Sequence, residues 1–93
     1  MREKYIEKKL VEKVKGLGGL ALKLISPGHS GIPDRLVLLP KGKIGFVELK
    51  ATGLLIRPLQ EKRKRQLESL GFLVYCIDSV EQIGGVVNEI QGA

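Results

Sequence analysis

Three charged residues in the middle of the chain have types and spacing suited to phosphodiester hydrolysis. Asp34 follows Pro33, Glu48 comes fourteen residues later, and Lys50 stands two positions beyond Glu48. Carboxylate oxygens are ligands that Mg²⁺ prefers, usually one or two carboxylates per ion with waters completing the shell. A lysine beside them can orient or deprotonate an attacking water and stabilise the charge that develops. The pattern therefore indicates a site for a divalent metal ion and a phosphodiester.

The same three residues also fit a purely structural role. Asp34 would then cap a turn, and Glu48 and Lys50 would form an ion pair at a strand end. Because Glu-x-Lys is a common tripeptide and surface ion pairs contribute little stability, the spacing alone does not decide. Three observations favour catalysis. The strand around Glu48 is otherwise apolar, Pro33-Asp34 precedes it at hairpin distance, and another acid, Glu7, falls inside an apolar helical stripe.

Hydrophobic periodicity predicts the elements that must position these residues. A helix over residues 2 to about 17 is indicated by apolar residues at helical spacing, namely Ile6, Leu10, Val14 and Leu17. A second helix is predicted from Pro58 to about Leu70, because proline suits a first helical position and Gly71 follows. A last helix after Ser79 is predicted to be weak, because Gly84 and Gly85 lower its helical propensity.

Four short apolar runs are predicted to be strands, at residues 21–25, 35–39, 44–50 and 72–77. The second and third would form a hairpin about the turn 40–43. Side-chain alternation would place Glu48 and Lys50 on one face of the third strand, together with Ile44 and Phe46. Because both faces of that strand are apolar, we expect it to be central and covered on both sides. The order α-β-β-β-α-β predicts an α/β fold, with a small mixed central sheet flanked by helices.

Composition narrows the class of protein. Ninety-three residues suffice for one domain, residues 1–93. The net charge of +6 with a pI near 9.7 favours an anionic partner such as nucleic acid, and the alternative is that the basic charge is incidental. The single cysteine, Cys76, excludes an internal disulfide and fits a reducing compartment. No apolar run approaches the roughly 20 residues of a membrane span, and no signal peptide opens the chain, so we expect an intracellular, cytoplasmic protein.

The combined pattern resembles a known nuclease family. Residues 31–38 (Gly-Ile-Pro-Asp-Arg-Leu-Val-Leu), 46–51 (Phe-Val-Glu-Leu-Lys-Ala) and 58–60 (Pro-Leu-Gln) resemble the virus-type replication-repair nuclease (VRR-NUC) family, a branch of the PD-(D/E)xK superfamily. The resemblance covers nearly the whole chain. It implies a restriction-endonuclease-like core, hydrolysis of DNA with Mg²⁺ or Mn²⁺, and a single VRR-NUC domain over residues 1–93.

The resemblance also implies roles for individual residues. Asp34 and Glu48 look like the metal-binding acids, with the backbone carbonyl of Leu49 as a further ligand, and Lys50 looks like the catalytic lysine. Glu7 is similar to the first-helix acid of related archaeal-type junction resolvases, where this acid supports metal or water.

Two of these assignments have alternatives. Glu3 could supply the first-helix acid in place of Glu7. Gln60 looks like the glutamine that reaches the site from the second helix, and it could equally bond a free backbone amide at the helix start.

Contacts to DNA are expected from basic side chains near the site. Lys23, His29, Arg35 and Arg63 are candidates, and the alternative is that they form an ordinary solvated surface. The chain has four aromatic residues and no recognisable base-reading module, so recognition should rest on phosphate contacts and DNA shape.

Stand-alone members of the family look like phage or prophage enzymes that cut four-way (Holliday) junctions. A chain this short has too little surface for both strands of a junction, so a homodimer making paired cuts is expected. Two alternatives stay open: a nuclease of the same fold acting on flaps or duplex DNA, and a non-catalytic DNA-binding subunit. No small-molecule cofactor is expected.

Overall fold

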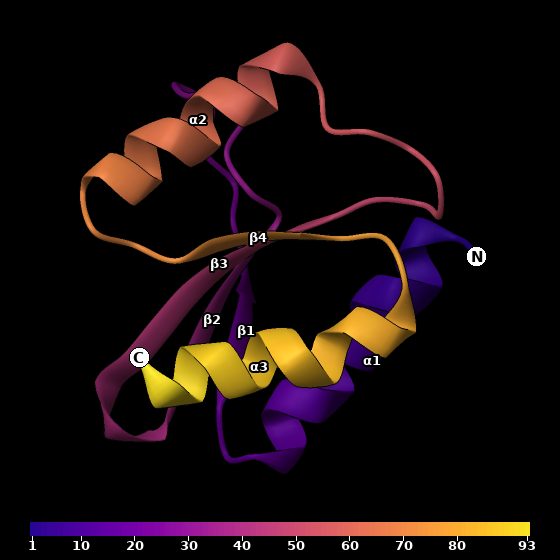
Figure 1. Ribbon diagram of the computed structural model, residues 1–93, viewed down its shortest axis with the longest axis vertical. Coiled ribbons are helices and arrows are strands. Elements are labelled where there is room, and N and C mark those ends of the chain that lie inside the picture. Colours follow the sequence, from indigo (N-terminus) through magenta and orange to yellow (C-terminus); the bar gives the residue numbers. More distant parts are fainter.

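Four strands form one mixed sheet in the order in which they occur along the chain, β1-β2-β3-β4 (Figure 1). The computed structural model describes residues 1–93, and their elements are α1 (Glu3–Gly16), β1 (Leu20–Lys23), β2 (Arg35–Leu39), β3 (Lys43–Leu49), α2 (Pro58–Ser69), β4 (Val74–Ile77) and α3 (Ile83–Gly92), with single 3₁₀ turns at Pro40–Gly42 and Val80–Gln82. The predicted α/β class and element order are confirmed.

The direction of each strand follows from its connection. β1, β2 and β3 are antiparallel neighbours, joined by the loop 24–34 and by the tight turn Pro40–Gly42, whereas α2 carries the chain back so that β4 runs parallel to β3. The predicted hairpin of β2 and β3 is therefore present, and β3 is the inner strand between β2 and β4. The first predicted strand lies slightly earlier than expected, at Leu20–Lys23, and the last is shorter, at Val74–Ile77.

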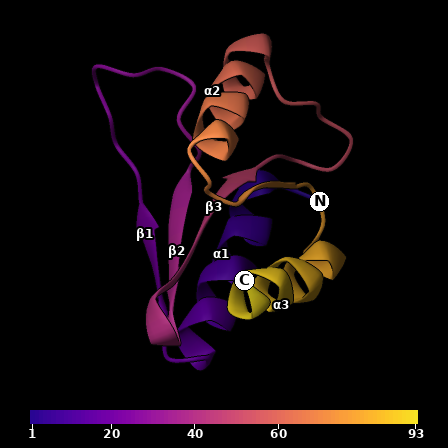
Figure 2. The same ribbon diagram turned by 60° about the vertical axis from the view of Figure 1, so that its left-hand side comes forward.

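The core lies between the sheet and the two helices α1 and α3, which Figure 2 shows on the same side of the strands. The apolar stripe predicted on the first helix is its buried face. The fully buried side chains of this layer come from all of these elements, and they include Ile6, Leu10, Val14, Val37, Val47, Leu49, Ile77, Val87 and Ile90. Their burial fixes which face of each strand points away from α1 and α3.

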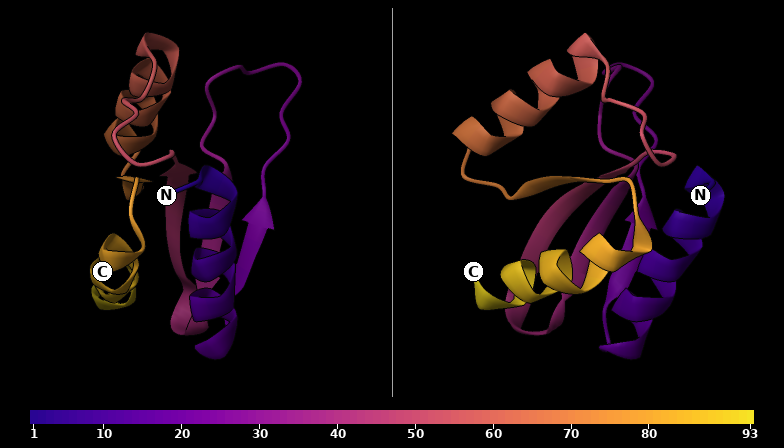
Figure 3. Two further views of the ribbon diagram at one scale, coloured as in Figure 1. Left: turned by 90° about the vertical axis from the view of Figure 1, so that its right-hand side faces the viewer. Right: turned by 45° about the vertical axis from the view of Figure 1, so that its right-hand side comes forward.

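The expectation that β3 is covered on both sides is wrong for part of its length. On the face opposite to α1 and α3, one end of the strand is left uncovered. In Figures 1 and 3, α2 lies beyond the end of β3 rather than along it. Leu20, Leu22 and Ile44 are 60%, 44% and 40% exposed on this face. We call its apolar part the open sheet face, which by strand register consists of Leu20, Leu22, Leu36, Leu38, Ile44 and Phe46.

The predicted last helix is present as α3, although Gly84 and Gly85 lower its helical propensity. The ten residues of α3 include three that are almost completely buried, Ile83, Val87 and Ile90. Gly45 of β3 lies beneath this helix, and a Cβ atom there would stand only 2.5 Å from Cδ1 of Ile90. Tertiary burial therefore outweighs the low helical propensity of the two glycines in the first turn of α3.

Substitutions in α3 test this conclusion. Ile90→Ala should lower the free energy of unfolding by about 2–5 kcal/mol, because it opens a cavity against the sheet. Gly85→Ala is the matched control. Gly85 is exposed and an added Cβ meets no atom within 4 Å, so this change should raise stability by about 0.5–1 kcal/mol. Thermal and urea unfolding of both variants measure the difference, and a small effect of Ile90→Ala would mean that α3 is not part of the core.

Candidate active site

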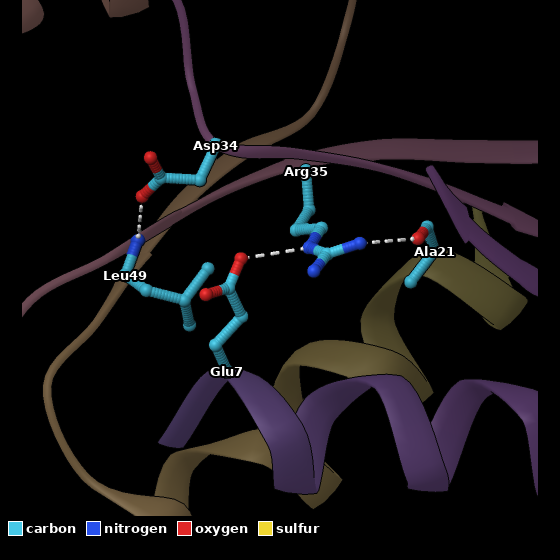
Figure 4. Close-up of polar contacts among 5 residues, drawn as sticks. All are labelled: Glu7, Ala21, Asp34, Arg35 and Leu49. Carbon is cyan, nitrogen blue, oxygen red and sulfur yellow. Dashed lines mark hydrogen bonds and ion pairs between the residues drawn. The ribbon is translucent and has the colours of Figure 1, made fainter. Parts of the chain in front are cut away.

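Asp34 lies where β2 begins, and its carboxylate is tied to the neighbouring strand. Oδ2 of Asp34 accepts a hydrogen bond from the backbone N–H of Leu49 at 2.9 Å (Figure 4). The carboxylate therefore takes the place of the backbone carbonyl that would accept the Leu49 N–H if the pairing of β2 and β3 continued to this residue. In a β-strand the N–H and C=O of one residue point to the same side, so the Leu49 carbonyl also faces toward Asp34.

The loop before Asp34 is fixed against α2. Gly31 has φ of +81°, and a Cβ atom there would lie 2.8 Å from the carbonyl oxygen of Leu59. Only glycine allows so close an approach in this conformation. Arg63 of α2 also donates from Nε to the carbonyl oxygen of Ser30 at 2.9 Å. These contacts place Pro33, and with it Asp34, at a defined point beside the end of β3.

Glu48 is the most buried acid of the chain. It is 7% exposed and leaves β3 on the face opposite to α1 and α3. Oε2 of Glu48 accepts a hydrogen bond from Nε2 of Gln60 at 2.6 Å and forms an ion pair with Nζ of Lys50 at 3.5 Å. Oε1 of Glu48 is buried and has no hydrogen-bonding partner. A buried carboxylate oxygen without a partner is costly, so this atom is a candidate ligand for a cation.

The electrostatic surroundings of Glu48 point the same way. The pKa of Glu48 is raised to about 7, chiefly by burial and next by the negative charge of nearby Asp34, which outweighs the lowering effect of Lys50. Two carboxyl groups this close cannot both be ionised cheaply unless positive charge is added. Burial likewise raises the pKa of the Cys76 thiol, and the neighbouring Glu48 adds to the effect.

Gln60 has both roles that the sequence left open. Its side-chain nitrogen donates to Glu48, while Oε1 accepts a hydrogen bond from the backbone N–H of Arg57 at 2.8 Å. The second contact closes the first turn of α2, in which Pro58 is the first helical residue. One buried amide therefore fixes the start of α2 and the orientation of Glu48 together.

Glu7 lies on α1 and reaches toward the same end of the sheet. Its Oε2 accepts a hydrogen bond from Nε of Arg35 at 2.8 Å, and the Glu7 side chain is 19% exposed. Figure 4 shows its carboxylate between the Arg35 side chain and the side chain of Leu49, at the end of the sheet where Asp34 lies. Glu3, the alternative first-helix acid, is exposed and forms none of these contacts.

The four residues suggested for DNA contact fall into two groups. Lys23 and His29 are exposed at the end of β1 and in the following loop. Arg35 and Arg63 instead use their guanidinium groups within the protein, Arg35 on Glu7 and Arg63 on Ser30 and Gln66. Lys23 and His29 are thus the two whose side chains have no partner within the protein, whereas the guanidinium groups of Arg35 and Arg63 are engaged.

Sequence reasoning missed two neighbours of Glu48. Cys76 lies directly beside it on β4, and Ile56 of the connector 50–57 lines the same small cavity of about 10 Å³. That volume is at the lower limit for one water molecule. The Glu48–Cys76 proximity depends on the parallel register of β3 and β4, for which no local signal exists in the sequence. Leu54 and Leu55 of the same connector are exposed.

The residues present fit a divalent ion that prefers oxygen ligands, such as Mg²⁺ or Mn²⁺, rather than one that needs His or Cys ligands. No group of three or more His, Cys, Asp and Glu side chains is arranged to hold a metal. Asp34 and Glu48 supply two carboxylates, one with a free buried oxygen, and the Leu49 carbonyl faces them. Mg²⁺ and Mn²⁺ accept such sets of few oxygen ligands with waters filling the remaining positions.

Comparisons with known proteins show which family the chain resembles. No family model matches the chain. Over 79 residues, 85% of each chain, it is 51% identical to "Putative nuclease p44" of Acyrthosiphon pisum secondary endosymbiont phage 1. A solved structure described as a VRR_NUC domain superposes with a TM-score of 0.86 at 34% identity, covering 92% of this chain and 94% of that one. None of the helices is long and apolar enough to cross a membrane. The resemblance noted in the sequence is confirmed, and the chain belongs to the VRR-NUC domain family.

Proposed function

We propose that this protein is a metal-dependent, structure-selective DNA endonuclease that resolves four-way junctions as a homodimer. Family membership supports the nuclease activity. The observation that carries the metal dependence is the buried, unpartnered Oε1 of Glu48 beside Asp34. Such a pair of acids has no benefit for a protein that only binds DNA, because carboxylates repel phosphates. A non-catalytic DNA-binding subunit is therefore the weaker alternative.

Asp34, Glu48 and the Leu49 carbonyl would hold Mg²⁺ or Mn²⁺. When bound there, the ion would lower the pKa of a water molecule and neutralise charge on the phosphoryl oxygens. Each side chain then has a definite task. Gln60 keeps Glu48 oriented through its 2.6 Å hydrogen bond, and Asp34 is held by the Leu49 amide.

Lys50 is the residue best placed to act on the nucleophile. Its ammonium group is 3.5 Å from Oε2 of Glu48, and its side chain is largely buried. It would orient the attacking water and stabilise negative charge on the phosphoryl oxygens. Attack of the water oxygen on phosphorus opposite to the sugar O3′ forms one P–O bond and breaks the P–O3′ bond. The products are a 5′-phosphate and a 3′-hydroxyl.

The open sheet face supports the homodimer. Its six residues, Leu20, Leu22, Leu36, Leu38, Ile44 and Phe46, include no polar side chain, although the protein is strongly basic. Contiguous exposed apolar patches can mark protein–protein interaction sites. A second copy of the chain presents the same patch, so two-fold pairing would cover both at once. Two active sites related by that axis would produce paired cuts in opposite strands of a junction.

Cleavage of flaps or plain duplex DNA is the second candidate reaction, since the same site would hydrolyse any phosphodiester that reaches it. DNA would be held through phosphates by exposed cations such as Lys23, and His29 lies in the loop beside them. In this proposal the enzyme acts in the cytoplasm, and residues 1–93 act as one nuclease domain.

Cleavage assays test the proposed function. Labelled four-way junction, flap and duplex DNA are incubated with the protein, with and without Mg²⁺ or Mn²⁺. Metal-dependent cutting with preference for the junction is expected. Glu48→Gln and Lys50→Ala should each reduce the cleavage rate about 100-fold or more while leaving DNA binding intact. Glu81→Gln, an exposed acid in the turn before α3, is the matched control and should remain active.

The possible failures of these assays are distinct. Binding without metal-dependent cutting would refute the enzyme, cutting of flaps alone would refute only the substrate, and full activity in both site variants would refute the assigned residues.

A charge placed on the open sheet face tests the dimer. Leu22→Glu should convert the protein from dimer to monomer in light-scattering measurements, because a carboxylate in an apolar interface has no partner. Paired cuts should become single nicks. Tyr5→Glu, an equally large change at an exposed position of α1, should leave the mass and the paired cuts unchanged. A wild-type monomer, or a dimer unaffected by Leu22→Glu, would exclude this interface.

The raised pKa of Glu48 predicts a pH dependence of stability in the absence of metal. The folded protein keeps a proton on Glu48 up to about pH 7, whereas the ordinary value is 4.5. The contribution of Glu48 protonation to the free energy of unfolding is therefore fully present below pH 4.5 and is lost as the pH rises through 7. At about 1.4 kcal/mol per pH unit, the loss is on the order of 3 kcal/mol.

Urea unfolding in a chelating buffer measures this loss at several pH values. Glu48→Gln, which cannot ionise, should lack it, and Mg²⁺ should restore stability to the wild-type protein at pH 8. Parallel pH profiles for the wild type and the variant would contradict the prediction.

A further inference from the structure

Arg35 directly follows the site residue Asp34, but its side chain points elsewhere. Strand alternation turns Arg35 toward α1, on the same face as Val37 and Val47, whereas the carboxylate of Asp34 is bound at the edge of β3. A long cationic side chain is unusual on a sheet face that packs against a helix. It requires a partner there, because a charge removed from water must be paired.

The guanidinium of Arg35 has two partners on two different elements. Nε donates to Oε2 of Glu7 on α1 at 2.8 Å, and Nη1 donates to the carbonyl oxygen of Ala21 on β1 at 2.9 Å. Figure 4 shows both contacts, with the Arg35 side chain between them. The side chain is only 18% exposed. A planar guanidinium held by two fixed acceptors has little freedom to reach for a phosphate.

Glu7 depends on this contact for its position. It rises from α1 toward Leu49 with one carboxylate oxygen on Arg35 and no other hydrogen bond or ion pair. Free of Arg35, the flexible glutamate would gain entropy and hydration by turning to solvent. At this end of the sheet Glu7, Asp34 and Glu48 carry three negative charges when all are ionised, and Arg35 and Lys50 carry two positive ones. One negative charge is left over to attract a metal ion.

We propose that Arg35 is a positioning residue, which holds the Glu7 carboxylate beside the metal-binding acids and does not itself bind DNA. The inference rests on the proposed function, since it assigns a role within the same site. Arg35 then acts on metal binding and catalysis only through Glu7, and not through the DNA contact suggested by the sequence. Removing Glu7 should therefore remove the consequence of changing Arg35.

A double-mutant cycle tests this dependence. Arg35→Gln, Glu7→Gln and the double variant are compared with the wild type in kcat, in the Mg²⁺ concentration giving half-maximal rate, and in Mn²⁺ affinity measured by calorimetry on protein alone. Each single variant should lower kcat about 10-fold and weaken Mn²⁺ binding by a similar factor. In the Glu7→Gln background, Arg35→Gln should change both quantities less than twofold. Arg35→Lys, which keeps a charge for Glu7, should recover part of the loss.

DNA affinity without metal distinguishes the two roles of Arg35. If it only positions Glu7, the Kd for junction DNA and its dependence on salt should be the same in Arg35→Gln and the wild type. Lys23→Gln, an exposed cation on β1, serves as the comparison and should weaken binding and reduce the salt dependence. A reduced salt slope in Arg35→Gln, or effects that add fully to those of Glu7→Gln, would overturn the inference.

Two further outcomes are informative. If Arg35→Gln does not fold, the cycle is made with Arg35→Lys, and full additivity with Glu7→Gln would still refute the coupling. If the wild type cuts no DNA, the proposed function fails. In that case coupled losses of Mn²⁺ affinity would still establish that Arg35 positions Glu7.

Discussion

The structure around the site depends on one constraint, because the carboxyl group of Glu48 is buried next to a second acid. The side chain is 7% exposed, one of its oxygens has no partner, and Asp34 adds a second negative charge nearby. This arrangement works against stability in the isolated protein. Every surrounding contact acts either to hold the two acids in place or to limit their repulsion.

Different elements contribute those contacts, and each has a structural reason for its position. Gln60 approaches Glu48 because the same side chain closes the first turn of α2. Asp34 meets β3 because Gly31 lets the preceding loop pass against α2. Positive charge comes from Lys50 within the site and from Arg35 behind it, on the other face of the sheet. Backbone contacts therefore fix Asp34 and the start of α2, and side-chain contacts from Gln60 and Lys50 orient Glu48.

The sequence was sufficient for the elements and the acidic pair, and insufficient where distant packing decides. Helical spacing and strand alternation act over a few residues, so α1, the β2–β3 hairpin and the shared face of Glu48 and Lys50 were predictable. The last helix was underestimated, because its stability comes from packing Ile90 over Gly45, a contact between residues far apart in the chain. Arg35 was assigned to DNA from its charge, although alternation with Val37 already placed it on the helix side.

The same alternation links the site to the open sheet face. Glu48 and Lys50 lie on the face of β3 that also carries Ile44 and Phe46, so the candidate site and the apolar patch share one side of one sheet. α2 covers the end with the charges and leaves the other end open. If two copies pair through that patch, rigid strands connect each active site to the two-fold axis, and no flexible linker intervenes. The separation of the two cuts would then be set by strand length and register, which gives a small protein a fixed geometry for recognising a branched DNA by shape.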